Sequence, residues 1–298
     1  MKTKQLLSAM LVFTAVMTSC KKDDFEKNKS VKDSGVEFTS RIMGDLATKA
    51  SGNRWDANDE IGVFMKQGVG LSKVLGANKK FTTKGDGNFS STGDDILNYP
   101  TKGQVDFIAY YPFSAAVSKN SVEINVADQK NQAKIDVMYS DNARGLNKKS
   151  GTAKLEFSHM LSKVEILVKA GTEIANLTGL KAGLTSIPTK SLLDLATGKI
   201  NQGSTQVNVD AKVSVQKADQ LVEAILIPGN YEGKKIVFSI ANDNYTWTIP
   251  ANTKLESGKR YAYSVTLLGS KAVKLEGNAT ITNWIAVPSG QVDVIQAD

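Results

Sequence analysis

The stretch VEFTSRI, residues 36–42, places apolar residues at alternate positions. Val36, Phe38 and Ile42 alternate with polar side chains, and Ser40 is the small residue on the same side. A period of two is typical of a β-strand with one face in a core and the other in solvent. Short runs rich in Val, Ile, Tyr and Thr recur at 61–65, 105–111, 135–139, 163–169, 207–215, 221–227, 235–240, 245–249 and 261–267. Gly, Asn, Asp or Pro bounds these runs, and this rhythm predicts an all-β fold of the sandwich type.

The chain shows little helical periodicity. Residues 172–183 and 189–197 are predicted to hold a helical turn or two, and no long amphipathic helix is evident. The most loop-like break is DNARGLNKKSGT at 141–152. It predicts a division into two β-domains, 36–147 and 148–298.

The first twenty residues have the plan of a secretory signal. Lys2 and Lys4 precede a mostly apolar run over 5–17, and the small residues Thr18 and Ser19 follow it. The run is shorter than the ~20 residues that a transmembrane helix needs. Residues 1–19 are therefore predicted to be a signal peptide.

Cys20 is the one cysteine of the chain, and it stands at the predicted cleavage point. Met17-Thr18-Ser19-Cys20 resembles the lipobox of bacterial lipoproteins, which implies that signal peptidase II cuts between Ser19 and Cys20 and that Cys20 carries the lipid. More than one acyl chain gives stable anchoring. A plain signal peptide with an incidental cysteine is the alternative.

The segment after Cys20 is rich in charge. Residues 20–35 are predicted to form a flexible lipidated tether, because they hold few apolar residues. KKDDFE at 21–26 resembles the export signal of some Bacteroidetes lipoproteins, which implies an outer-membrane lipoprotein at the cell surface. A solvated tether without this signal is the alternative.

Composition argues against several function classes. The formal net charge is +7, but the basic residues are scattered as isolated pairs with acids between them. A nucleic-acid groove needs basic residues clustered on one face, so no nucleic-acid partner is expected. With Cys20 lipidated, the mature chain has no free thiol and a single histidine, which excludes Cys–His pairs and His-rich zinc sites. No Walker A loop or complete dinucleotide fingerprint occurs, so no cofactor is expected.

No catalytic or metal-ligating residue is predicted. His159 lies in the apolar segment LEFSHML, and without a Gly-x-Ser-x-Gly elbow we interpret it as structural rather than as part of a Ser-His-Asp triad. Asp56 to Glu60 begins like a calcium loop but lacks the glycine at position six and has Gln67 at position twelve. A capped acidic turn is predicted there, with structural Ca²⁺ as the alternative. Paired carboxylates of a surface hydrolase also stay an alternative, because their spacing is spatial.

Five blocks, in order, resemble the Bacteroidales fimbrillins, the Mfa-like pilus subunits. They are WDANDEIGVFM at 55–65, FIAYYP at 107–112, LEFSHMLSKV at 155–164, GKRYAYSV at 258–265 and ATITNW at 279–284. The first block matches a W-x-x-x-D-x-I-G-V-F pattern. The resemblance covers residues 36–285 and implies two transthyretin-like (Greek-key) β-sandwich domains in tandem. It also implies a non-enzymatic building block of a fimbria that contributes to adhesion.

The resemblance implies a maturation mechanism. Fimbrillins reach the surface as lipoproteins, and a trypsin-like protease then removes the N-terminal segment with its first strand. A strand of a neighbouring subunit, in a homo- or hetero-polymer, fills the opened groove by β-strand addition. The implied partners are other fimbrial subunits, the maturation protease and, before cleavage, the outer membrane.

These features map onto particular residues. The candidate removable strand lies in 36–49, with Val36, Phe38 and Ile42 pointing into the groove. The family's cleavage motif Thr-Arg-Ala corresponds to Thr48-Lys49-Ala50, where lysine departs from the pattern, so cleavage after Arg41 or Arg54 is the alternative. The candidate donor strand lies near 287–295, where Val292 and Val294 alternate with polar residues.

A second function stays open at this point. Trp55, Trp247 and Trp284 could form a stacking platform on a surface glycan-binding lipoprotein. Because each of them lies in or beside an apolar strand, we interpret the three tryptophans instead as core or interface residues.

Overall fold

The computed structural model describes residues 35–43, 55–201 and 205–284. All of them belong to one compact unit, Gly35–Asp298. Strands dominate these residues, which include no α-helix and only two 3-10 turns, Gly93–Asp95 and Gln132–Lys134. No helix in the described ranges is long and apolar enough to cross a membrane. The predicted all-β fold is confirmed.

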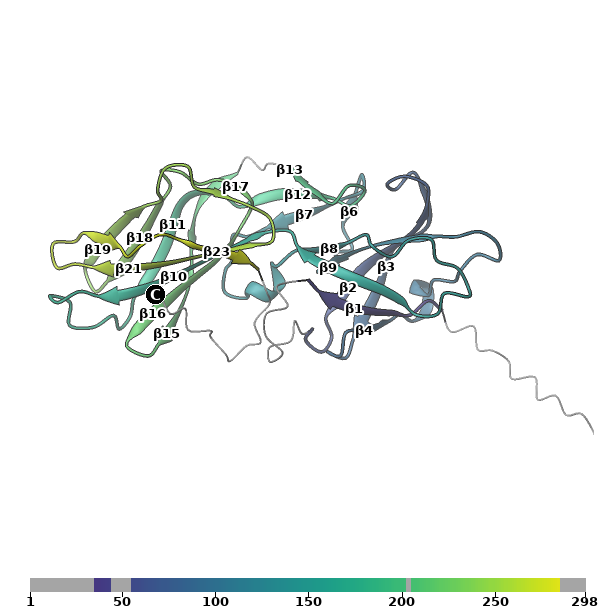
Figure 1. Ribbon diagram of the computed structural model, residues 1–298, viewed down its shortest axis with the longest axis horizontal. Coiled ribbons are helices and arrows are strands. Elements are labelled where there is room, and N and C mark those ends of the chain that lie inside the picture. Colours follow the sequence, from purple (N-terminus) through teal and green to yellow (C-terminus); the bar gives the residue numbers. More distant parts are fainter. Residues whose placement is uncertain (1–34, 44–54, 202–204, 285–298) are drawn as a thin grey trace, which may run out of the picture. The chain divides into compact units, whose positions relative to one another are not determined.

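Seven strands close into a barrel (Figure 1). They are β1 (Phe38–Ile42), β2 (Glu60–Gln67), β3 (Lys73–Thr83), β4 (Asn88–Ser90), β5 (Asp106–Tyr111), β8 (Met138–Ser140) and β9 (Ala153–His159). Their order around the barrel is β1-β4-β3-β2-β5-β8-β9, and β9 pairs with β1 to complete the ring. Alternating burial along β9 and β1 shows one face of each strand in a core, as the sequence period requires.

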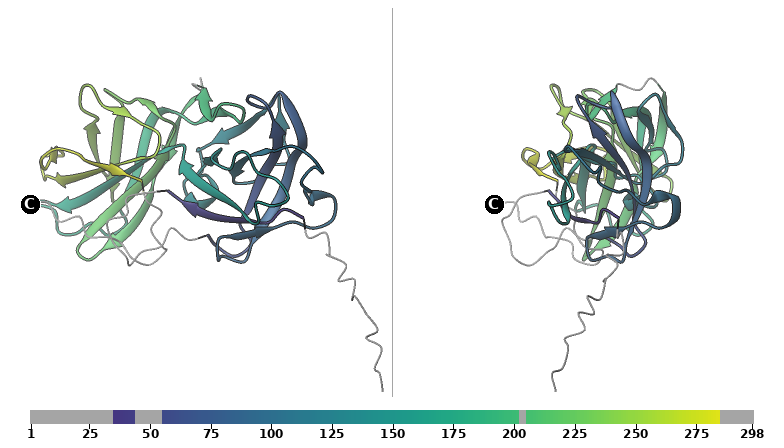
Figure 2. Two further views of the ribbon diagram at one scale, coloured as in Figure 1. Left: turned by 45° about the vertical axis from the view of Figure 1, so that its right-hand side comes forward. Right: turned by 90° about the vertical axis from the view of Figure 1, so that its right-hand side faces the viewer.

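Two further sheets pack as a sandwich, which can be followed in Figure 2 from the teal of β10 through green to yellow. One sheet comprises β15 (Lys212–Gln216), β16 (Asp219–Leu226), β10 (Ser162–Ala170), β21 (Lys259–Leu267), β22 (Val273–Leu275) and β23 (Thr280–Asn283). The other comprises β14 (Gln206–Asp210), β11 (Lys181–Pro188), β18 (Lys235–Ile240) and β19 (Asp243–Thr248). Their inner faces share one hydrophobic cluster, which includes Val164, Leu184, Phe238 and Tyr261. Burial of this kind is the main favourable contribution to the fold.

A small sheet joins the two halves of the sequence. It comprises β13 (Lys199–Asn201), β12 (Lys190–Asp194), β7 (Ser121–Asn125) and β6 (Val117–Ser118), and β17 (Gly229–Asn230) pairs separately with β20 (Lys254–Leu255). A hydrophobic cluster beside it contains Ile108 and Tyr110 from β5 together with Leu193, Ile225 and Trp284. The two halves therefore share part of their core.

The pairing of β9 bears on the domain boundary predicted at 147/148. That point lies in the loop between β8 and β9, and these two strands are neighbours in the same barrel. The last barrel strand ends at His159, and β10 of the sandwich begins at Ser162. The division into two domains stays a prediction, and strand pairing would place its boundary after His159.

The helical turns predicted in 172–183 and 189–197 are wrong where these ranges overlap two strands, β11 and β12. β11 and β12 occupy residues 181–188 and 190–194, because Ala182, Leu184 and Leu193 alternate with more exposed side chains. The run 207–215 is also two strands, β14 and β15, in different sheets. Between them, the Ala211 N–H donates to the Ala182 carbonyl, where the chain crosses from one layer to the other.

Candidate functional site

The first strand is the element that closes the barrel. β1 runs parallel to β9, with Phe38 opposite Ala153 and Ile42 opposite Phe157, and antiparallel to β4, with Phe38 opposite Phe89. Figure 1 shows β1 beside these strands. We call the place between β4 and β9 that β1 occupies, with Phe81, Phe107 and Gly87 on its inner side, the first-strand seat. Hydrogen-bond partners on both sides make β1 an inner strand and not an edge strand.

Apolar side chains of β1, together with Val36 just before it, fill the inner side of the seat. Val36 and Ile42 are buried, and Phe38 is only 1% exposed. The Phe38 ring meets Phe81 and Phe107 edge to face, at centroid distances of 4.9 and 5.0 Å. Edge-to-face contacts add roughly 0.5–1.5 kcal/mol each beyond area burial. The seat therefore has a closed aromatic pocket at the level of Phe38.

At Ser40 the seat is narrow and polar. The Ser40 hydroxyl donates to the Gly87 carbonyl over 3.0 Å, and the Ser40 N–H donates to the same oxygen over 2.8 Å. Gly87 has φ +77°, and a Cβ built on it would lie 3.0 Å from the Ser40 carbonyl oxygen. Glycine at 87 thus permits both the turn and the close approach of the two chains.

Of the candidate cleavage residues, Arg41 lies within the described part of the chain. Arg41 projects outward from β1, is 62% exposed and pairs with Glu156 at 2.5 Å. Its backbone lies in the ladder with β9, so the chain on both sides of it is held in the barrel. Lys49, Ala50 and Arg54 lie outside the described residues, as do Ser19, Cys20, Val292 and Val294.

The sequence did not indicate that Phe81 and Phe107 are the aromatic partners of Phe38. Phe81 lies in β3, a strand that the pattern KVLGANKKFTT did not indicate, because Gly76 and the polar run after it interrupt the alternation. Asn78 takes a left-handed φ of 45° in this strand, and the register shifts between Val63 and Met65 of β2. The recurrence of phenylalanine at 81, 89 and 107 was the one usable signal.

The interpretation of the three tryptophans as core residues is confirmed, and the stacking platform is wrong. Trp55, Trp247 and Trp284 are 5%, 6% and 4% exposed, so a sugar ring has no free indole face to stack on. Trp55 packs edge to face against Phe89, Tyr111 and Phe157 inside the barrel. These rings belong to the core because they bury a large apolar area there.

His159 has structural contacts. Its ring stacks on Trp284 at 4.4 Å, and its Nδ1 lies 2.9 Å from Asp136 Oδ1. The buried Nε2 has no hydrogen-bond partner among the described atoms, so no serine hydroxyl completes a Ser-His-Asp triad there. This arrangement positions the end of β9 and offers no activated nucleophile.

In the acidic turn before β2, the Asp59 carboxylate is hydrogen-bonded to groups of the protein itself. Asp59 accepts hydrogen bonds from the Asp56 N–H at 2.8 Å and from the Tyr111 hydroxyl at 3.1 Å. Burial raises the pKa of Asp59 despite these bonds. Within the described ranges, no group of three or more His, Cys, Asp or Glu side chains is placed to hold a metal ion.

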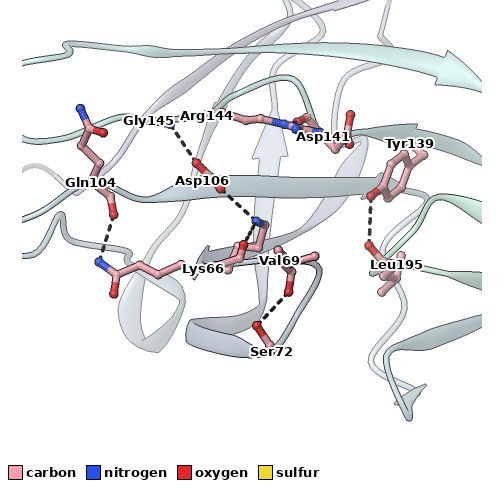
Figure 3. Close-up of polar contacts among 12 residues, drawn as sticks. Lys66, Val69, Ser72, Gln104, Asp106, Tyr139, Asp141, Arg144, Gly145 and Leu195 are labelled. Carbon is pink, nitrogen blue, oxygen red and sulfur yellow. Dashed lines mark hydrogen bonds and ion pairs between the residues drawn. The ribbon is translucent and has the colours of Figure 1, made fainter.

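A polar network fastens the 141–146 loop to the barrel (Figure 3). Asp106 Oδ2 accepts from the Lys66 ammonium at 2.9 Å, and Asp106 Oδ1 accepts from the Gly145 N–H at 2.8 Å. Lys66 also donates to the Gly68 carbonyl at 2.7 Å. Burial raises the pKa of Asp106, but the bonds from Gly145 and Lys66 prevail and the net shift is downward.

Asp106→Asn is expected to lower the free energy of unfolding by about 1 kcal/mol at pH 7, since the amide keeps the size but loses the charge. Because the folded-state pKa of Asp106 is lowered, its contribution is complete above pH ~4 and is lost as the pH falls below that value. Denaturant titrations at pH 7 and pH 3 should therefore show a smaller difference between the variant and the parent at pH 3. An equal difference at both values would contradict this role of the charge.

Comparison with known proteins agrees with this architecture. The fimbrillin-like family model matches residues 48–284. A relative from Bacteroides uniformis, named "Putative fimbrium subunit Fim1C", is 27% identical over an alignment 299 residues long. The alignment covers 94% of this chain and 95% of the relative.

Solved structures share the fold. A "putative cell adhesion protein" from Bacteroides uniformis superposes with a TM-score of 0.71 at 23% identity, over 85% of this chain and 99% of its own. Another from Bacteroides ovatus superposes with a TM-score of 0.69 at 22% identity, over 85% of this chain and 98% of its own. The family model covers most of the sequence, including the ranges of all five sequence blocks, so the chain belongs to the fimbrillin-like family.

Proposed function

We propose that this chain is a non-enzymatic structural subunit of a cell-surface fimbria, and that the first-strand seat is where a neighbouring subunit attaches. Membership of the fimbrillin-like family supports the role of fimbrial subunit. The observation that carries the attachment site is β1 itself. It is a five-residue strand near the start of the described chain, it closes a barrel, and it buries Phe38 and Ile42.

Removal of β1 would leave a specific binding groove. The facing edges of β4 and β9 would lose their hydrogen-bond partners, and Phe81 and Phe107 would be uncovered. An unpaired edge beside an apolar pocket binds an added strand through main-chain hydrogen bonds, with register set by side chains. Keeping β1 in place until delivery would prevent premature association.

The delivery route belongs to the same proposal. The lipobox supports cleavage between Ser19 and Cys20, lipidation of Cys20 and residence in the outer membrane before maturation. Cleavage after Lys49 or Arg54 then frees the subunit from its anchor. Arg41 is the poorer substrate, because proteases bind extended unpaired chain and its backbone is paired with β9. The donor strand of a neighbouring subunit, for which 287–295 with Val292 and Val294 is this chain's own candidate, completes the barrel.

Strand uptake tests the proposal. The chain 20–298 with Cys20→Ser, carrying a site-specific protease sequence in place of residues 45–51, is cut and incubated with a labelled peptide of residues 35–43. We expect the peptide to replace the cut segment, seen as a mass exchange by native mass spectrometry. The uncut chain is the control and should take up none. A cut chain that never incorporates the peptide would disprove strand exchange at this seat.

Limited trypsin digestion tests the cleavage site. Apart from cuts after the lysines of the predicted tether 20–35, the first N-terminal cuts of chain 20–298 should fall after Lys49 or Arg54 and not after Arg41, as read by N-terminal sequencing. With Lys49→Gln, the cut should move to Arg54. A first cut after Arg41 would show that β1 opens in the intact precursor.

A further inference from the structure

We infer that the first-strand seat selects a strand with an aromatic residue at the level of Phe38, and that this strand comes from a subunit of a different sequence. The inference rests on the proposed strand exchange and names the partner. It also assigns the pocket formed by Phe81 and Phe107 as the determinant of specificity.

β1 shows what the seat accepts. Inward positions at intervals of two take a buried aliphatic residue, Val36, then a fully enclosed aromatic ring, Phe38. The next inward position takes Ser40, whose hydroxyl bonds to Gly87, and the last takes Ile42. The direction is also defined, since an occupant that reproduces β1 runs parallel to β9 and antiparallel to β4.

The aromatic position is the most demanding of the four. Phe38 is 1% exposed, and both rings that enclose it are 0% exposed. Tyr99 continues the aromatic cluster, with its ring 5.9 Å from that of Phe107. Close-packed surroundings relax only partly around a smaller side chain, so a smaller occupant leaves a cavity.

The chain's own candidate donor, VPSGQVDVI at 287–295, fits this seat poorly in β1's direction. With Val292 at the aromatic level, Val294 replaces Ser40, and Gln296 would enter the apolar position of Ile42. With Gly290 at that level, the pocket is empty. The other registers place Val287, Pro288, Ser289, Gln291, Asp293, Val294 or Ile295 at that level. None of these residues is aromatic, so no register fills the pocket, and the polar ones are costly to bury without partners. A second copy of this chain is therefore a weak donor through this segment.

Peptide competition tests the inference with the same cut chain. We expect the 35–43 peptide with Phe38→Val to bind about 10- to 100-fold more weakly than the native 35–43 peptide, because the pocket loses a phenyl ring. The 287–295 peptide should bind at least as weakly as the Phe38→Val peptide. The matched control is the 35–43 peptide with Arg41→Val, which changes an outward residue and should bind within about fivefold of the native peptide.

The outcomes separate the two proposals. Equal binding of the native 35–43 peptide and the 287–295 peptide would overturn the aromatic selectivity while strand exchange stands. Equal weakening by Phe38→Val and Arg41→Val would overturn the pocket as the determinant. Failure of every peptide to bind would overturn the proposed exchange itself, and the inference with it.

Discussion

Phe38→Ala is expected to lower the free energy of unfolding of the intact precursor by about 3–5 kcal/mol. The ring is enclosed by Phe81 and Phe107, and its strand is the one that joins β4 to β9. Truncation removes the buried ring and leaves a cavity in the closed barrel. Denaturant unfolding of chain 20–298 measures the effect, through a shift of the midpoint at similar slope.

Arg41→Ala in the same strand is the matched control. Arg41 is exposed and pairs with Glu156 at the surface, so its loss should change the free energy of unfolding by no more than about 1 kcal/mol. Similar effects of the two substitutions would contradict the enclosed pocket. A large effect of Phe38→Ala alone would mean that β1 stabilises the precursor chiefly through its inner face.

Glu223→Ala is expected to cost about 3 kcal/mol of stability, because it leaves Lys163 without one of its two partners in a partly buried ion cluster. Glu223 is 10% exposed and lies 2.9 Å from Lys163 and 3.1 Å from Lys212. Lys163 also pairs with Glu165, which lies 3.7 Å from Arg260. The cluster bridges β15, β16, β10 and β21 of one sheet. Its charges lie on the face opposite the hydrophobic core, because they alternate along the strands with core residues such as Val164 and Ala224.

The pH dependence gives this prediction a second measurement. Burial raises the pKa of Glu223, but Lys163 and Lys212 outweigh it and the net shift is downward. The contribution of Glu223 is therefore complete above pH ~4.3 and is lost as the pH falls below that value. Glu123→Ala is the control, because Glu123 and Lys190 form an exposed pair worth less than about 1 kcal/mol. If both glutamates gave equal losses at pH 7, the buried cluster would have no special stabilising role.

Alternation predicted strands well where a whole run lies in one strand of one sheet. The runs at 163–169, 235–240 and 261–267 lie in β10, β18 and β21. Prediction failed where the chain bends or changes layer. β14 and β15 appeared as one run, since the crossing at Ala211 leaves the period intact. At 135–139 the strand begins only at Met138, because a 3-10 turn covers the residues just before Ile135.

The sequence predicted which side chains of the first strand point inward, but not which strands form the seat around it. The inward positions of Val36, Phe38 and Ile42 follow from the period of two. The strands that pair with β1 do not follow from the sequence. Arg41 of β1 and Glu156 of β9 are 115 residues apart, and no local pattern specifies which strand a given strand pairs with. The tryptophans show the same limit, since an indole near an apolar strand suits a core as well as a surface until the packing is known.

Side-chain patterns along the chain were enough to predict the all-β class, the apolar face of each regular strand and, through ordered motifs, membership of the fimbrillin-like family. These are local properties, encoded in the side-chain period and in short blocks. The folded chain was needed to show that β1 closes a barrel between β4 and β9, that the tryptophans are buried, and that Phe81 and Phe107 enclose Phe38. Those features depend on non-local pairing, in which hydrogen bonds are alike for every strand and side-chain packing selects the partner.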